Sequence, residues 1–109
     1  MANIYKNAKL DLTTASATTL YTAPSDSRAI IKSLLVCDDS NNGSTLTVTV
    51  TDVSSNVFVL FDVKSVAGHA TEEFLTHPII LEENEILKVT AADADRLHVM
   101  ASILEISRS

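Results

Sequence analysis

The oxygen-rich segment Asp38-Asp39-Ser40-Asn41-Asn42-Gly43 is the part of the chain most similar to a ligand site. Oxygen-bearing side chains stand at positions 1, 3 and 5 and glycine at position 6, as at the start of an EF-hand calcium loop. Position 12 of such a loop requires a bidentate glutamate, and Thr49 stands there instead. Asn-Gly between two strands is also typical of a hairpin turn, because both residues tolerate a positive φ. We therefore expect a hairpin turn, with a cation site of another type as the alternative.

The histidines and paired acidic residues form no known catalytic pattern. His69, His77 and His98 are not spaced as the H-x-H or H-E-x-x-H pairs of metal sites. Residues 72–73 and 82–85 offer carboxylate pairs, but a short chain without Trp is a poor basis for a glycosidase cleft. The sequence also has no P-loop, G-x-S-x-G elbow or Cys/His nucleophile arrangement. We therefore predict a protein that is not an enzyme and uses no cofactor or metal, with these residues in turns and at solvated sheet edges.

The balance of charge and hydropathy argues against two classes of partner. The formal net charge is −6, with eight Lys and Arg against fourteen Asp and Glu. The basic residues are scattered, and an acidic domain repels phosphate backbones, so we expect no nucleic-acid partner. No window approaches the ~18–20 apolar residues of a membrane span, so we expect no membrane partner either.

Cys37 is the only cysteine in the sequence. The fold therefore cannot depend on an intrachain disulfide or on an oxidising compartment. The residue lies in an apolar run, where we expect a small buried side chain rather than a reactive thiol. The first residues are polar and lack the apolar core of a secretory signal. The sequence predicts a soluble protein made in the cytoplasm.

Strand periodicity dominates the chain. From Thr45 to Thr51, threonine alternates with an aliphatic residue, so Leu46, Val48 and Val50 share one face of a strand. The 109 residues are enough for one domain, and they are rich in the β-branched Thr, Val and Ile. Many short strands between polar turns predict an all-β fold, an antiparallel β-sandwich of about eight strands, with the jelly roll as one form of it. We expect strands near residues 9–13, 18–22, 28–37, 45–52, 57–63, 71–76, 86–91 and 97–106.

Two of these strands carry apolar side chains on both faces. In the run from Ala29 to Cys37, simple alternation puts Leu35 on the side of Ile31 and places Leu34 on the other. The run from Val57 to Phe61 has the same character. A strand that is apolar on both faces must bury both, so the second face is covered either within the molecule or by another subunit. Both alternatives stay open at this point.

Residues 1–7 precede the first expected strand. We expect them to form an N-terminal arm that orders when it docks on a partner, with a single β-sandwich domain over residues 8–109. The arm and the apolar strand faces together give the residues that we expect at an interface, which are Ile4, Tyr5, Ile30, Leu34, Val36, Val57 and Val59.

Leu20-Tyr21-Thr22-Ala23-Pro24 is followed by a short polar turn and the run from Ala29 to Cys37. This part of the chain resembles small structural proteins of tailed bacteriophages. Residues 46–50, 81–91 and 97–106 are also similar to small virion proteins from phages of marine bacteria. The resemblance covers about residues 8–106 and departs at Asp38, where an asparagine is expected. Its motifs concern packing and turns rather than catalysis.

The resemblance implies a virion structural protein with a β-sandwich fold. The role that it favours is a capsid decoration, or cement, protein that binds the major capsid protein and stabilises the capsid lattice. It also implies a homo-oligomer, with a trimer as one candidate, on the capsid surface after synthesis in the cytoplasm of a bacterial host. A neck, tail or fibre-associated virion protein is the alternative. A carbohydrate-binding β-sandwich module is a further alternative, and the absence of Trp counts against it.

Overall fold

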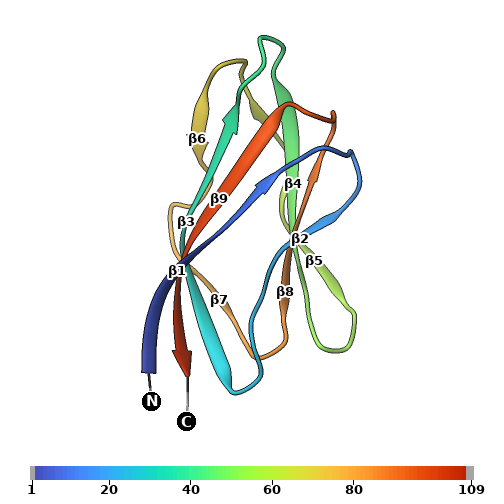
Figure 1. The fold of residues 1–109 in the computed structure, drawn as a ribbon. Helices are drawn as coiled ribbons and strands as arrows, with labels where there is room; N and C mark the ends of the chain where they lie inside the picture. The colour runs from blue at the N-terminus through green and yellow to red at the C-terminus, as the bar shows by residue number, and fades with distance from the viewer. Residues whose placement is uncertain (1, 108–109) are drawn as a thin grey trace.

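The computed structural model describes residues 2–107, which form nine β-strands (Figure 1). Over this part of the chain there is no helix that is long and apolar enough to cross a membrane. The strands are β1 (Ala2–Asp11), β2 (Thr18–Thr22), β3 (Ser27–Asp38), β4 (Ser44–Thr51), β5 (Val57–Val66), β6 (Thr71–Glu73), β7 (Ile79–Leu81), β8 (Ile86–Ala91) and β9 (Leu97–Ser107).

The strands form two antiparallel sheets that pack face to face. One sheet has the order β1-β9-β3-β6, with β7 also paired to β3, and the other has the order β2-β8-β4-β5. The pairings nest within one another: β4 with β5, β3 with β6 and β7, β2 with β8, and β1 with β9. The chain is thus one long double-stranded hairpin that rolls up and gains the pairings of β3 with β9 and β4 with β8. This topology is the jelly roll, and the predicted antiparallel sandwich is confirmed.

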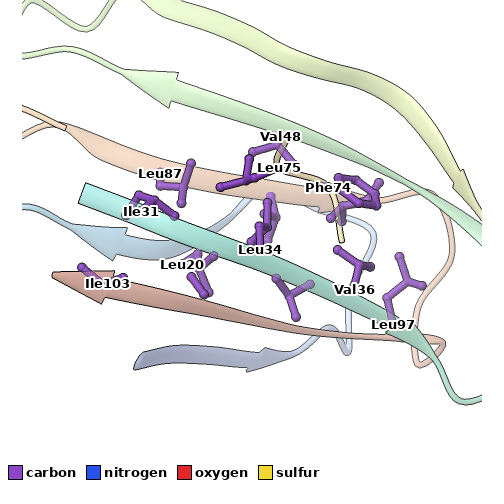
Figure 2. Packing of buried hydrophobic residues seen from close by; sticks show 14 of the residues in the cluster. Leu20, Ile31, Leu34, Val36, Val48, Phe74, Leu75, Leu87, Leu97 and Ile103 are labelled. Atoms are coloured by element: carbon purple, nitrogen blue, oxygen red, sulfur yellow. The ribbon is translucent and has the colours of Figure 1, made fainter. Parts of the chain in front are cut away.

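Aliphatic side chains from both sheets fill the space between them. Leu46 and Val48 point inward from β4, Leu87 and Val89 point inward from β8, and all four are fully buried. Figure 2 shows such side chains from the two sheets meeting in one core. Each Leu or Val buried in this way stabilises the fold by roughly 1.5–3 kcal/mol. The alternation of threonine and aliphatic residues in β4 therefore places Leu46 and Val48 in the core, as the sequence predicts.

The strand bounds agree with the prediction in part. β2 and β8 have the predicted bounds, and those of β3, β4 and β9 differ by one residue. β5 ends at Val66 instead of near residue 63, β6 ends at Glu73 instead of near residue 76, and β1 begins at Ala2 instead of near residue 9. The sequence analysis missed β7, because three residues after Pro78 are too few to show an alternating pattern.

Residues 2–7 belong to the first sheet. They pair with β9 in register, with Tyr5 opposite Leu104 and Asn7 opposite Ser102. From residue 2 onward the expected arm is therefore part of an edge strand, while residues 1, 108 and 109 lie outside the described residues. β9 is eleven residues long, and its backbone N–H and C=O groups need partners along its whole length. A mostly polar segment can supply these backbone partners as well as an apolar one can.

A bulge in β3 decides which of its side chains face the core. The pairing with β9 shifts by one residue between Ile31 and Ser33, which leaves Lys32 as the extra residue. Ile31 before the bulge and Leu34 after it therefore both point into the core. They are three residues apart, and a regular strand would place them on opposite faces.

Because of the bulge, the prediction is wrong for two of the expected interface residues. Leu34 and Val36 are fully buried in the core, so they are not available to a partner. Ile30 is the one β3 residue of that set on the outer face, where it is half-buried. The outer side of β3 is thus apolar only in part, with Leu35 at 38% exposure beyond the bulge.

Candidate functional site

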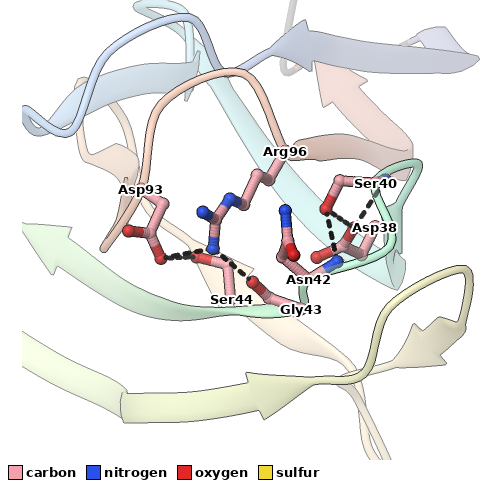
Figure 3. A network of polar contacts seen from close by, with 7 residues as sticks. All are labelled: Asp38, Ser40, Asn42, Gly43, Ser44, Asp93 and Arg96. Atoms are coloured by element: carbon pink, nitrogen blue, oxygen red, sulfur yellow. Dashed lines mark hydrogen bonds and ion pairs between the residues drawn. The ribbon is translucent and has the colours of Figure 1, made fainter.

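The segment from Asp38 to Gly43 joins two sheets and is not a hairpin, because β3 and β4 pair with different neighbours. The prediction of a hairpin turn is therefore wrong, although Gly43 does have a positive φ of 74°. Oδ1 of the buried Asp38 accepts hydrogen bonds from the Ser40 amide at 2.7 Å and the Ser40 hydroxyl at 2.6 Å. Arg96 donates to the Gly43 carbonyl at 2.9 Å and pairs with Asp93 at 3.3 Å (Figure 3). These bonds tie the β3–β4 corner to the β8–β9 connection.

This corner has the features of a structural joint. Oδ2 of Asp38 is buried without a hydrogen-bond partner. Nowhere in residues 2–107, however, do three or more His, Cys, Asp or Glu side chains gather as metal ligands. His69 and His77 lie in connecting segments, outside the strands. The described geometry therefore gives no support to the alternative of a cation site.

Glu73 stabilises the β3 bulge. Its carboxylate accepts hydrogen bonds from the Leu34 amide at 2.7 Å, the Leu75 amide at 3.2 Å and the Ser33 hydroxyl. Partial burial alone would raise the pKa of Glu73, but these three donors outweigh it and hold the pKa below its ordinary value. The acidic pair at residues 72–73, expected to be solvated, thus includes one structural carboxylate.

We expect Glu73→Gln to lower the free energy of unfolding at pH 7 by about 1 kcal/mol, because neutral hydrogen bonds replace charge-assisted ones at a partly exposed site. A folded-state pKa below the unfolded one gives stability above the ordinary value of 4.5, and that stability is lost as pH falls through the folded-state pKa. The difference between wild type and variant should therefore shrink at low pH in urea unfolding experiments. Glu72→Gln is the matched control, and an equal, pH-dependent loss in both variants would contradict the assignment.

A second carboxylate joins the two sheets near the chain termini. Glu105 of β9 is largely buried and accepts hydrogen bonds from the Tyr21 hydroxyl of β2 and from Lys6 Nζ of β1 at 2.9 Å. Burial would raise the pKa of Glu105, but the two hydrogen bonds and the charge of Lys6 outweigh it and lower the pKa. Burial and the neighbouring carboxylate raise the pKa of Tyr21. This cluster therefore holds the two sheets together.

A row of apolar side chains crosses the outer face of the first sheet. Tyr5, Leu104, Ile30 and Ile80 stand opposite one another across β1, β9, β3 and β7. Tyr5 is 75% exposed and Ile80 is 66% exposed, while Leu104 and Ile30 are half-buried. Side chains directly opposite on one face are in contact range. We call these four residues the outer stripe.

A shallow hollow of about 570 Å³ lies further along the same face. Leu35 and Met100, opposite each other on β3 and β9, give it an apolar floor. His98 and Asp11 also line it, with 3.2 Å between His98 Nε2 and Asp11 Oδ1, and Asp39 Oδ2 lies 3.6 Å from the same nitrogen. The stripe and the hollow are thus two apolar areas on one face, and the hollow has a polar rim at one end, as protein-binding surfaces often do.

Cys37 also lines the hollow, where it is half-buried rather than fully buried as expected. It stands opposite His98 in the register of β3 and β9. The hollow thus contains the thiol that the sequence places in an apolar run.

The second apolar surface is the edge strand β5. Val57 and Val59, both expected at an interface, are 60% and 54% exposed. Phe58 and Leu60 between and beyond them are 54% and 40% exposed. The structure therefore leaves four consecutive apolar residues in solvent at the edge of the second sheet.

The structure separates the expected interface residues into different regions. Tyr5 and Ile30 meet in the outer stripe, Val57 and Val59 lie on β5, and Ile4 is 49% exposed on the opposite side of β1 from Tyr5. Sequence reasoning missed Ile80 and Leu104 of the stripe. Ile80 belongs to the strand that went unpredicted, and Leu104 becomes an outer residue only through its register with Tyr5 and Ile30.

Neither a protein-family model nor a curated protein matches this chain, whereas solved structures do. A structure of the acid-stable capsid of Helicobacter pylori bacteriophage KHP30 has a TM-score of 0.61 at 12% identity, covering 97% of this chain and 89% of that one. A protein of Bacillus endospore appendages, described as disulfide-linked pili, has a TM-score of 0.59 at 12% identity, covering 98% and 89%. A pentameric capsid protein from metagenomic phage sequences has a TM-score of 0.51 at 14% identity, covering 94% and 60%. At such identities the similarity establishes the fold alone.

Proposed function

We propose that this chain is a structural protein of a bacteriophage virion, and that its role is to decorate and stabilise the capsid. The observation that carries the proposal is the outer face of the first sheet, where the stripe and the hollow leave apolar side chains exposed across four strands. Apolar surface of this extent on a small domain marks a contact with another protein. The fold, which recurs in phage capsid proteins, supports the same role.

The mechanism of such a protein is binding alone. We propose that the outer face contacts the major capsid protein and that many copies bridge neighbouring capsid subunits. Contacts that are weak one at a time become effective when many copies are held on one lattice. The proposed role needs no catalytic residue, cofactor, membrane or nucleic acid, and it places the protein on the virion after synthesis in the host cytoplasm.

A neck, tail or fibre component is the second candidate within the virion. The similarity to a protein of Bacillus endospore pili favours it, because that protein also builds an extended assembly. With one cysteine in each chain, however, disulfides between copies of this protein can join only pairs and cannot run along a fibre. For this reason the capsid role is preferred.

The proposal is tested by adding purified protein to virions that were assembled without it and sedimenting the mixture. We expect wild type to sediment with the particles and Ile80→Asp to bind at least about tenfold more weakly, because a charge then lies in the stripe. Ala92→Asp, an exposed alanine away from the stripe, is the matched control and should bind as wild type does. Equal binding by all three proteins would contradict the role of the outer face, and failure of wild type to bind would contradict the decoration role.

A further inference from the structure

Strand β5 is an open sheet edge, and its register with β4 shifts only beyond Val59. It pairs with β4 on one side only, since the second sheet ends there (Figure 1). Proteins that stay monomeric usually protect such edges with charged residues, proline or a covering segment. The residues from Val57 to Phe61 include no charge and no proline, and Val57, Phe58, Val59 and Leu60 are all at least 40% exposed. An edge of this kind is a template for another strand.

The hydrogen bonds of the β4–β5 hairpin show which backbone groups of β5 face away from β4. The Asp52 amide donates to the Asn56 carbonyl at 3.0 Å at the end of the β4–β5 ladder. Hydrogen-bonded and non-hydrogen-bonded pairs alternate in an antiparallel ladder, so Phe58 forms the next bonded pair with Val50. The N–H and C=O groups of Val57 and Val59 therefore point away from β4, toward the open side of the strand.

We propose that β5 pairs with β5 of a second copy of this chain in an antiparallel, two-fold contact centred on Phe58. In this register Val57 lies opposite Val59 of the second copy, and Val59 lies opposite its Val57. The two strands then form four N–H···O=C bonds, which use every outward backbone group of both valines. A register shifted by two residues leaves part of these groups unpaired.

The available surface suits a weak dimer. The four consecutive apolar residues from Val57 to Leu60 are 40–60% exposed. Together they leave on the order of 400 Å² of surface in solvent, so two copies would bury up to about 800 Å², the size of a weak or transient contact. We therefore expect a weak dimer, which lattice contacts would reinforce in a particle.

This contact would give the homo-oligomer that the resemblance to phage virion proteins implies, and it is tested on the isolated protein. Sedimentation velocity over a concentration series should show wild type as a monomer–dimer equilibrium. Val59→Lys and Val59→Pro should weaken dimerisation at least about tenfold, since one places a charge on the edge and the other removes an outward N–H. Thermal unfolding should show both variants folded. The control is Ile80→Lys, with its lysine on the other sheet, which should dimerise as wild type does.

Cysteine crosslinking tests the register itself. In a Cys37→Ser background, Phe58→Cys faces its own copy across the two-fold axis and should form a disulfide-linked dimer on mild oxidation. Val57→Cys faces Val59 instead and should not crosslink. A wild-type protein that stays monomeric throughout the series, or Ile80→Lys dissociating while Val59→Lys does not, would overturn the proposal. These outcomes leave the virion role to be judged by the particle experiment alone.

Discussion

Replacing Leu34 by aspartate is expected to prevent folding, whereas the same change at Leu35 should leave the fold intact. Leu34 is fully buried and Leu35 is 38% exposed in the hollow. Leu34→Asp loses about 1.5–3 kcal/mol of burial and adds several kcal/mol for an unpaired buried carboxylate. That sum approaches the whole stability of a domain, about 5–15 kcal/mol. Far-UV circular dichroism and urea unfolding measure both variants.

The same pair of variants separates folding from binding. Leu35→Asp should change the free energy of unfolding by less than about 1 kcal/mol while weakening binding to particles, because it places a charge in the hollow. If both variants are unfolded, the outer face of β3 belongs to the core. If both fold equally well, the position of the bulge is wrong.

The second large effect concerns deletions in β3. Removing Leu35 shifts every later residue of the strand to the opposite face, so the buried Val36 and Asp38 would point to solvent. We expect this deletion to unfold the protein. Removing Lys32 takes out the extra residue of the bulge and keeps Ile31 and Leu34 on the inner face.

Deletion of Lys32 is therefore the control for deletion of Leu35. It should give a folded protein that is destabilised by about 1–3 kcal/mol, because the Leu34 amide would lose its hydrogen bond to the Glu73 carboxylate. Thermal unfolding of the two deletions side by side measures the contrast. A folded Leu35 deletion, or two equally unfolded proteins, would contradict the account of the bulge.

The sequence predicts most strands because their side-chain alternation is local. Thr45 to Thr51 shows which residues enter the core without any knowledge of neighbours. The pairing partners come from contacts far apart in the chain, so the separation of β3 and β4 into different sheets could not be seen locally. One local sign of the bulge was available, since Lys32 and Ser33 are two consecutive polar residues inside an apolar run.

The binding surfaces could be predicted only in part. Exposure of Val57 and Val59 follows from the position of β5 at a sheet edge, which is a property of topology rather than of the residues themselves. The outer stripe depends on register across four strands, and β7, which supplies Ile80, has no visible pattern of its own. Tyr5 was expected at an interface as part of the arm and Ile30 from strand alternation, but their meeting in one row required the structure.

The most direct test of the central claim is the copy number of this chain in purified virions, measured by quantitative mass spectrometry against the major capsid protein. A decoration protein on the capsid lattice should be present at about one copy per capsid subunit, or about one per three. Absence of the chain from the particles would contradict a virion role. A handful of copies per particle would contradict the capsid role and support the neck, tail or fibre alternative.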